Sequence, residues 1–297
     1  MEIRQLNYFV KAAETLNFTE AAKISHITQS TLSQQIKQLE NSLDIELFHR
    51  IGKRVVLTEA GKTFYVYAKQ ILAKAEQSKK TIQDLNNLEY GELRIGITYA
   101  LRNIIIQAIT AFNIRYPKIK FNITFATTDE LIDKTKKLEF DFTASFLDEN
   151  YIDEELLFEP ILHCPIVYVQ SKLNALINKK KIRLVDLEQI PLALPEKRFS
   201  TRQHLESVFK LNKINPNIVM EINDIAALFQ LIETGHWATI TSEITLNNNE
   251  NLEVLPIIGI GKPREASIIT AIDIVESKAV KEFKQIVKQT ITSLSFS

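Results

Sequence analysis

The sequence predicts an α+β chain of several domains, and three patterns carry this prediction. Apolar residues recur at helical spacing through residues 6–43, and two short apolar strands follow. A long helix comes next, with an apolar period of 3.5 residues over three heptads. From Leu93 onward, strand and helix patterns alternate to the end of the chain. A length of 297 residues suffices for about two cores.

Composition limits the class of protein. The chain has 45% hydrophobic and 24% charged residues, which excludes an intrinsically disordered protein. Its 36 basic residues balance 36 acidic ones, and a net charge of +0 argues at face value against a protein that coats nucleic acid or membranes. Cys164 is the single cysteine, which excludes an internal disulfide and a cysteine cluster for a metal, and fits a reducing compartment.

The sequence lacks targeting motifs and catalytic motifs. The charged start at Glu2 and Arg4 is unlike a secretory signal, and no apolar run approaches the ~20 residues that span a bilayer. We therefore expect a soluble, cytoplasmic protein with no membrane partner. Gly259 and Gly261 precede Arg264 where a dinucleotide loop needs its third glycine, and there is neither a nucleophile elbow nor a phosphate loop. We expect no enzyme, no cofactor and no metal ion.

Two short helices open the chain. The first ends at the polar break Leu16-Asn17, and Thr19 is the expected N-cap of the second, over residues 20–23. Thr28 is the expected N-cap of a third helix. The second and third helices, joined by the tight turn Ile24-Ser25-His26, predict a helix-turn-helix. The apolar positions of the first helix are Leu6, Phe9, Val10 and Ala13.

The third helix separates apolar from amide and hydroxyl side chains. Its apolar residues step by four, three and four and predict one buried stripe: Leu32, Ile36, Leu39 and Leu43. The polar residues assigned to the opposite face or beside it are Gln29, Ser30, Ser33, Gln34 and Lys37. Glutamine can pair bidentately with adenine, and serine can bond to a purine or a pyrimidine. The alternative is an ordinary solvated helix face.

Two short strands after the third helix favour a winged helix-turn-helix. Residues 47–50 and 55–58 predict these strands, with a turn at Gly52-Lys53. Arg50, Lys53 and Arg54 lie at or beside the turn. This is where a wing contacts phosphates or the minor groove.

At this point the chain resembles the LysR-type transcriptional regulators. The resemblance is dense over residues 1 to 62, and its motifs are Arg4-Gln5-Leu6, Phe18-Thr19-Glu20-Ala21-Ala22, Thr28-Gln29-Ser30-Thr31-Leu32-Ser33, Leu39-Glu40, Leu47-Phe48 and Leu57-Thr58-Glu59-Ala60-Gly61. It implies that Thr28, Gln29, Ser30, Ser33, Gln34 and Lys37 face the major groove of double-stranded DNA, with Arg50 and Arg54 on its backbone. The family commonly has proline where Ser30 stands and arginine where Gln34 stands, so affinity and preferred sequence differ here.

A long helix from residue 59 to residue 89 connects the two halves of the chain. Thr58 is its expected cap, and its 3.5-residue period is typical of a two-helix coiled coil. The seam residues are Phe64, Ala68, Ile71, Ala75, Ser78, Ile82 and Leu85. The alternative is a helix that packs on its own domain. Family members dimerise through this helix, which implies a homodimer or homotetramer on a pseudo-palindromic site, with recognition helices ~34 Å or a multiple of it apart.

Alternating strands and helices predict an α/β fold with a largely parallel sheet for the rest of the chain. The expected strands are 93–98, 120–126, 140–146, 165–169, 191–194, 218–222, 237–240 and 266–271. The looser family resemblance here implies two lobes, like those of periplasmic solute-binding proteins. We divide the chain into a winged domain (1–58), a linker helix (59–89), lobe I (92–162 plus 266–297) and lobe II (163–265).

Ligands of open parallel sheets bind beyond the carboxyl ends of the strands, which here means between the lobes. The candidates for effector binding are Thr98, Tyr99, Ala100, Thr127, Thr128, Ser145, Phe199, Ser200, Thr201, Asn223 and Thr239. Ser200-Thr201, expected just before a helix and flanked by Arg198 and Arg202, would suit a small anion such as a carboxylate. The alternative for each threonine is a helix cap, and for Tyr99 a place in the core.

The leading interpretation is a sequence-specific DNA-binding regulator whose inter-lobe cleft senses a small effector, with RNA polymerase as a further partner. One alternative is a cytosolic small-solute-binding protein without DNA-directed function, for which residues 92–297 would suffice. The other is an enzyme fused to a DNA-binding domain. Residues 1–60 hold seven basic and seven acidic residues, so we expect few phosphate contacts and a shallow salt dependence of binding.

Overall fold

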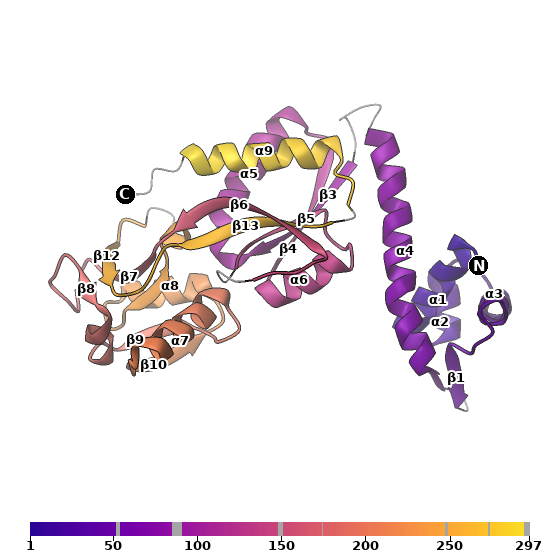
Figure 1. The fold of residues 1–297 in the computed structure, drawn as a ribbon, viewed down its shortest axis with the longest axis horizontal. Helices are drawn as coiled ribbons and strands as arrows, with labels where there is room; N and C mark the ends of the chain where they lie inside the picture. Colours follow the sequence, from indigo (N-terminus) through magenta and orange to yellow (C-terminus); the bar gives the residue numbers. More distant parts are fainter. Residues whose placement is uncertain are drawn as a thin grey trace. The chain divides into compact units, whose positions relative to one another are not determined.

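The computed structural model describes residues 1–51, 54–84, 91–147, 151–173, 175–246, 249–272 and 274–293. The chain forms two compact units (Figure 1). The first contains residues 1–83 with 137–139, and the second contains residues 84–136 with 140–297. The long helix thus belongs to the same unit as the helix-turn-helix. No helix of the described ranges is long and apolar enough to cross a membrane.

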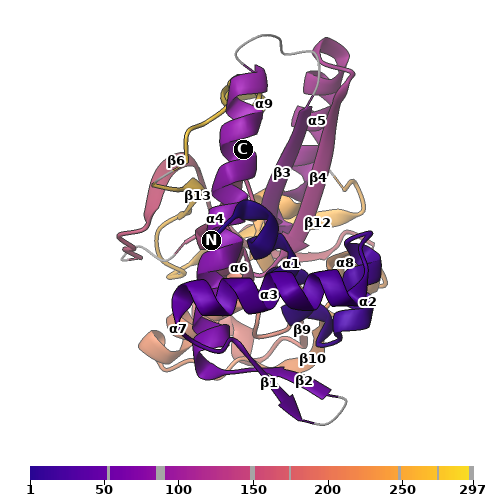
Figure 2. The ribbon, with the colours of Figure 1, turned by 90° about the vertical axis from the view of Figure 1, so that its right-hand side faces the viewer.

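The first unit is the predicted winged helix-turn-helix followed by the long helix. Its elements are α1 (Ile3–Thr15), α2 (Phe18–Ile24), α3 (Gln29–Leu43), β1 (Phe48–Ile51), β2 (Arg54–Leu57) and α4 (Glu59–Asp84). Figure 2 shows α3 along its length, with the hairpin of β1 and β2 beside it. Three of the four predicted stripe residues of α3, Leu32, Ile36 and Leu39, have no exposed surface and pack with α1 and α2. The fourth, Leu43, is half-buried against the same core.

Side-chain caps set the helix starts, and one predicted cap is wrong. Asn17, not Thr19, caps α2, since its Oδ1 accepts hydrogen bonds from the N–H groups of Thr19 (2.9 Å) and Glu20 (3.2 Å). Asparagine is at least as good a cap as threonine, and its position adds two helical residues, Phe18 and Thr19, before Glu20. Thr28 caps α3 as predicted, through a bond from Thr31 N–H at 3.2 Å. Thr58 caps α4, where the N–H of Gly61 donates to its hydroxyl at 2.8 Å.

The first half of the predicted coiled-coil seam lies inside the winged domain. Ala68 is fully buried in the core of this domain, and Phe64 and Ile71 pack against the same core. The ring of Phe64 lies 5.1 Å from that of Phe9 in α1. For these residues the alternative, a helix that packs on its own domain, is the observed state. Of the remaining seam residues, Ala75 is half-buried, Ser78 and Ile82 are exposed, and Leu85 lies outside the described residues.

Lobe I, in the second unit, is a sheet covered by helices on both faces (Figure 1). α5 and α9 pack on one face, and α6 packs on the other. The strand order is β4-β3-β5-β13-β6. Its elements are β3 (Gly91–Thr98), η1 (Tyr99–Leu101), α5 (Arg102–Arg115), β4 (Ile119–Ala126), α6 (Thr128–Lys136), β5 (Phe142–Phe146), β6 (Leu156–Cys164), β13 (Arg264–Ala271) and α9 (Lys278–Ser293).

Lobe II has a similar layered build, with α7 and α8 against different clusters of its core. Its strands are ordered β11-β7-β12-β8 and β10-β9, and a bridge between Leu192 and Ala238 connects the two sets. Its elements are β7 (Ile166–Ser171), β8 (Ile182–Arg183), η2 (Leu184–Glu188), β9 (Leu192–Pro195), α7 (Ser200–Asn212), β10 (Ile218–Ile222), α8 (Ile225–Glu233), β11 (Thr239–Ser242), η3 (Glu243–Leu246) and β12 (Leu252–Ile258).

The prediction of a largely parallel sheet is wrong, because both lobes are mixed. In lobe I, β3 pairs in parallel with β4 and β5, whereas β13 pairs antiparallel with β5 and β6. In lobe II, β7 pairs antiparallel with β11 and β12. One of these antiparallel pairs is formed by β6 and β13, the two strands next to the junctions of lobe I with lobe II.

Candidate nucleic-acid interface and inter-lobe cleft

The polar face of α3 is open to solvent. Gln29, Ser30, Gln34 and Lys37 are exposed, as predicted, while Ser33 is only half-exposed because it lies at the flank of the buried stripe. The hydroxyl of Thr28 is largely engaged within the helix start: it bonds to the hydroxyls of Ser30 (2.9 Å) and Thr31 (2.8 Å) besides capping the helix. Amide groups and one ammonium thus project from an α-helix of a width that the major groove admits.

A carboxylate of α3 holds the start of the wing. Oε1 of Glu40 accepts hydrogen bonds from the backbone N–H groups of Leu47 (2.8 Å) and Phe48 (3.2 Å). The carbonyl of Leu47 accepts from Thr58 N–H at 3.0 Å, and the Thr58 hydroxyl donates to Glu46 O at 2.8 Å. The backbone between Glu46 and Phe48 is therefore fixed by α3 on one side and by the start of α4 on the other.

The wing is the predicted two-stranded hairpin, with β1 one residue later and β2 one residue earlier than predicted. Arg50 lies on β1, paired with Val55, and Arg54 lies on β2, paired with Ile51. The third basic residue of the predicted wing, Lys53, lies outside the described residues.

Lobe I brings several of its predicted effector residues together at the carboxyl ends of β3, β4 and β5. Thr98 ends β3 and is buried, and Tyr99 and Ala100 follow it in η1. The hydroxyls of Thr128 and Ser145 lie 2.8 Å apart, so one hydroxyl donates to the other. The predicted residues of this lobe are Thr98, Tyr99, Ala100, Thr127, Thr128 and Ser145, of which Thr127 lies between β4 and α6.

Lobe II places Phe199, Ser200 and Thr201 at the start of α7. Phe199 is the residue before the helix, and the two hydroxyl residues form its first turn instead of preceding it. All three are buried, and the ring of Phe199 contacts Tyr99 of lobe I edge to face at 5.3 Å. The first hydrogen bond of the helix is from Gln203 N–H to Phe199 O, so the preceding N–H groups remain outside the helical ladder. Asn223 is exposed after β10.

Thr239 does not lie at the carboxyl end of its strand, so the reason for choosing it is wrong. The strand was predicted to end near residue 240, but β11 begins at Thr239 and ends at Ser242. Ala238, which the prediction placed inside the strand, forms an isolated bridge with Leu192 instead. Glu243 follows the carboxyl end instead. Its Oε2 is buried with no hydrogen-bond partner among the described residues, and burial raises the pKa of this carboxyl.

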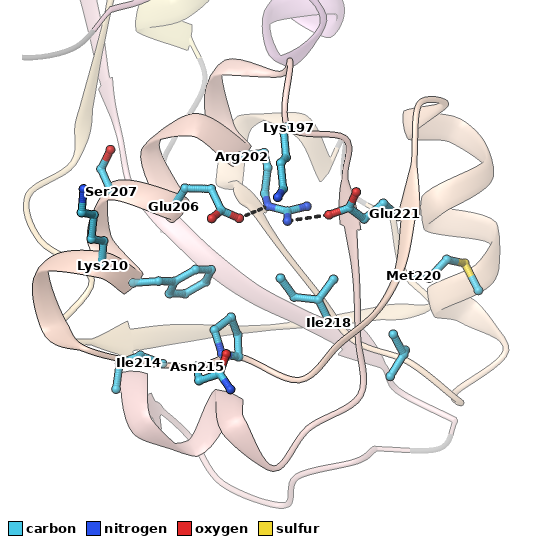
Figure 3. A pocket seen from close by; sticks show the side chains of 13 residues that line it. Lys197, Arg202, Glu206, Ser207, Lys210, Ile214, Asn215, Ile218, Met220 and Glu221 are labelled. Atoms are coloured by element: carbon cyan, nitrogen blue, oxygen red, sulfur yellow. Dashed lines mark hydrogen bonds and ion pairs between the residues drawn. The ribbon is translucent and has the colours of Figure 1, made fainter.

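The two arginines beside Ser200 and Thr201 are engaged elsewhere. Figure 3 shows the guanidinium of Arg202, which is 1% exposed, between two carboxylates at the wall of a pocket of about 720 Å³ on lobe II. Its Nε donates to Glu206 and its Nη2 to Glu221, each at 2.7 Å. Arg198 pairs with Glu196 at 3.1 Å. Neither arginine is a free partner for a ligand at the start of α7.

Two other arginines, which the sequence patterns did not single out, line cavities shared by the two lobes. Arg264 is buried at the start of β13, with its guanidinium 5.0 Å from the ring of Phe146. It lines a cavity of about 460 Å³ that His204 of α7 also lines. Arg102 lines a second cavity, of about 320 Å³. Motif spacing could not predict that either arginine lines a cavity, because each cavity forms only where the two lobes meet.

The described residues contain no group of three or more metal-ligating side chains close enough to hold an ion. The sulfhydryl of Cys164 is buried where β6 leaves lobe I, and the N–H of Ile244 donates to its sulfur at 3.4 Å. Burial is the main cause that raises the pKa of this thiol to about 11. A thiol with such a pKa is protonated at neutral pH and a poor nucleophile.

Comparison with known proteins gives two family matches. A profile described as "LysR substrate binding domain" matches residues 86–292, and one described as "Bacterial regulatory helix-turn-helix protein, lysR family" matches residues 3–62. A probable RuBisCO transcriptional regulator of Thalassiosira pseudonana is 30% identical over 291 residues, which is 95% of each chain. The transcriptional activator CmpR of Synechocystis sp. is 29% identical over 260 residues, covering 86% of this chain and 85% of CmpR.

Solved structures share the fold along the whole chain. Full-length OxyR from Pseudomonas aeruginosa has a TM-score of 0.73 at 20% identity, covering 99% of this chain and 96% of that one. CbnR in complex with its target DNA has a TM-score of 0.68 at 23% identity, covering 98% and 100%. With a recognition helix, a wing and a two-lobed domain in place and both family profiles matched, the chain belongs to the LysR family of DNA-binding transcriptional regulators.

Proposed function

We propose that this regulator binds a pseudo-palindromic operator as a homodimer or homotetramer and responds to a small anionic effector between its lobes. The observation that carries the DNA-reading part is the exposed amide face of α3, opposite the buried side chains of Leu32, Ile36 and Leu39. A helix that only filled a core would not present Gln29, Gln34 and Lys37 together to solvent. RNA polymerase is the further partner that regulation of transcription requires.

The DNA-reading face is tested by gel-shift binding of the full chain to its own upstream region. We expect Gln29→Ala with Lys37→Ala to abolish specific retention, because both lost side chains leave base or phosphate contacts unmade. The matched control removes one glutamine and one lysine from exposed positions of lobe II, Gln230→Ala with Lys172→Ala, and leaves retention unchanged. Unchanged affinity of the first double variant for the site would contradict the assignment of this face.

The dimer proposal rests on the exposed part of α4. Ile82 is 63% exposed at a seam position, whereas Ile71 packs in the domain's own core. We therefore choose Ile82→Asp as the test, because the same change at Ile71 would damage the winged domain itself. Light scattering of Ile82→Asp is expected to give monomers. Lys79→Asp, at an exposed position off the seam, is the control that keeps the dimer, and an intact dimer in both variants would refute the seam.

The effector proposal is supported by hydroxyls and free N–H groups at the place where the lobes meet. Ser200 and Thr201 begin α7, where unpaired N–H groups and the helix dipole favour a negative charge. The paired state of Arg202 leaves this role to the helix start and to the hydroxyls of lobe I. A thermal-shift screen of matched carboxylates and amides tests the charge of the effector. Stabilisation by uncharged ligands alone would contradict an anionic one.

The alternative of a solute-binding protein without DNA-directed function differs in one observable property. Such a protein would bind its ligand but would not retain the upstream DNA in the gel shift. The match of residues 3–62 to a bacterial regulatory helix-turn-helix profile favours the regulator.

A further inference from the structure

A cavity of about 320 Å³ lies between η1 and α5 of lobe I and α8 and η3 of lobe II. Tyr99, Arg102 and Asn103 line it from lobe I, and Ile225, Phe229 and Thr245 line it from lobe II. Apart from Tyr99, none of these residues belongs to the predicted effector cleft. Its walls therefore need an explanation of their own.

Arg102 is the charged group of this cavity, and aromatic rings hold it. Its guanidinium lies over the ring of Tyr99 at 6.0 Å and over that of Phe125 at 5.5 Å. Among the described residues it makes neither a hydrogen bond nor an ion pair, whereas Arg202 and Arg198 are both paired with glutamates. Rings that interact with the face of a guanidinium leave its N–H edge available, and this edge matches a carboxylate in two parallel hydrogen bonds.

The opposite wall is apolar. Ile225 and Phe229 come from α8 and pack with the core that surrounds this helix. The nearby carboxylate of Asp224 is already engaged, because it accepts the N–H groups of Ala226 (2.8 Å) and Ala227 (3.0 Å) as the cap of α8. An apolar wall facing a held guanidinium favours a ligand with an apolar body and one negative end.

A hydroxyl completes the set of groups at the cavity. Oγ1 of Thr245 is buried and has no hydrogen-bond partner among the described residues. Buried hydroxyls are normally paired, and one that lines a cavity suits a second polar atom of a ligand.

We propose that this cavity is a second ligand site, which takes a small amphipathic carboxylate with its negative end on Arg102 and its apolar body on Ile225 and Phe229. A ligand there touches both lobes and so stabilises the arrangement in which they meet. A regulatory effect of this stabilisation rests on the proposed function, whereas binding of the ligand to the cavity does not. The site uses none of the Thr128, Ser145 and Thr201 hydroxyls assigned to the main cleft.

The test is calorimetric titration of the full chain with phenylacetate, and with phenylacetamide as its neutral counterpart. The fluorescence of Trp237 provides a second readout, because this single tryptophan packs against the same cluster as Ile225 and Phe229. We expect saturable binding of phenylacetate and at least tenfold weaker binding of the amide. Arg102→Met should weaken phenylacetate binding by about 10- to 100-fold, the usual effect of losing a charged hydrogen-bond pair.

Matched variants separate this site from the main cleft. Arg115→Met removes an arginine from the far end of the same helix and should leave binding unchanged. Thr201→Val alters the main cleft and should also leave phenylacetate binding unchanged. Equal binding by Arg102→Met and the wild type, loss of binding in Thr201→Val alone, or no saturable binding below about 10 mM would each overturn the proposal. The gel shift of the upstream DNA is scored separately, so failure of this site is distinguishable from failure of the proposed function.

Discussion

The ring of Tyr99 meets the ring of Phe199 edge to face, with 5.3 Å between their centroids, and this contact joins lobe I to lobe II. Tyr99 also lies 6.0 Å from the ring of Phe125, so the contact belongs to a small aromatic cluster in lobe I. Separation of the lobes at this point must break the contact. The energy of this ring contact therefore contributes to the free-energy difference between the joined and the separated arrangement of the lobes, which is the equilibrium that an effector shifts.

We expect a double-mutant cycle of Tyr99→Leu and Phe199→Leu to give a coupling of about 0.5–1.5 kcal/mol, the range for aromatic pairs beyond their buried area. Urea unfolding of the four proteins measures it. Phe199→Leu combined with Tyr151→Leu, whose ring contacts Phe158 instead, should be additive within about 0.5 kcal/mol. Additivity in the first cycle would show that the ring contact does not couple the lobes.

Arg202→Met should destabilise the protein by about 1–3 kcal/mol, because it removes a buried cation from the carbonyl of Pro195 and from two carboxylates that are themselves partly exposed to water. Arg198→Met is the control. This arginine is largely exposed, and loss of its pair with Glu196 should change the free energy of unfolding by about 0–1 kcal/mol. Equal effects in urea titrations would contradict the difference in burial.

Gly61→Ala should destabilise the winged domain by about 1–3 kcal/mol or prevent its folding, since an added Cβ would lie 2.1 Å from the carbonyl oxygen of Leu47. That oxygen is fixed by its hydrogen bond from Thr58 N–H. The neighbouring change Ala60→Gly removes a methyl group instead of adding one. It lowers helix propensity and loses a contact with the domain core, and it should cost about 1 kcal/mol. Circular dichroism during urea unfolding compares the two, and wild-type stability of Gly61→Ala would contradict the close approach.

His26→Gly should stabilise the winged domain by about 0.5–1 kcal/mol. His26 has φ of +55° in the turn between α2 and α3, a conformation that costs a side chain about 1–2 kcal/mol and that glycine adopts freely at a smaller entropic cost. His26→Ala keeps the strain and serves as the control. The melting temperature of each variant measures the effect, and a lower value for His26→Gly than for His26→Ala would refute it.

Cys164 should stay unreactive towards thiol reagents at pH 8 until the protein unfolds, because burial raises the pKa of its thiol to about 11. The folded state holds this proton more tightly than the unfolded state. The protonated thiol's contribution to the free energy of unfolding is therefore complete below the unfolded thiol's pKa of about 8.5. It is lost as the pH rises towards 11. Unfolding of wild type and Cys164→Ala across this range measures it. A growing advantage of the wild type with pH would contradict the sign.

Local patterns predicted the winged domain well and the two-lobed domain less well. The stripe of α3 and the caps Thr28 and Thr58 depend on neighbours within four residues, so the sequence carries them directly. β6 and β12 were not predicted. Each contains a proline, Pro160 and Pro256, and proline argues against a strand unless its missing N–H faces an edge or a bulge. β6 and β12 take part in antiparallel pairs, but so do predicted strands, because β13 pairs antiparallel with β5 and β11 with β7. The alternation of strands and helices therefore does not by itself determine strand direction.

The effector residues were predicted from strand ends, and the structure places them at strand ends where the predicted strand bounds are right. Thr128 and Ser145 come from separate elements, yet they meet at 2.8 Å because β4 and β5 both flank β3. Thr239 lies at the start of its strand instead of its carboxyl end, because β11 begins two residues later than the predicted strand. Arg102 and Arg264 could not be found, since a lone arginine in a sequence gives no indication of which rings or lobes will surround it.

The grip of Glu40 and Thr58 on the backbone around Leu47 has a mechanical consequence for the proposed dimer. The recognition helix and the start of α4 hydrogen-bond to the same peptide groups. The winged domain is therefore held rigidly at its junction with α4. In the proposed dimer, each winged domain would therefore move together with its own α4 helix as one rigid body. The crossing angle of the paired α4 helices would then determine the distance between the two recognition helices. That distance in turn determines the half-site spacing or the bend of the operator that the dimer fits.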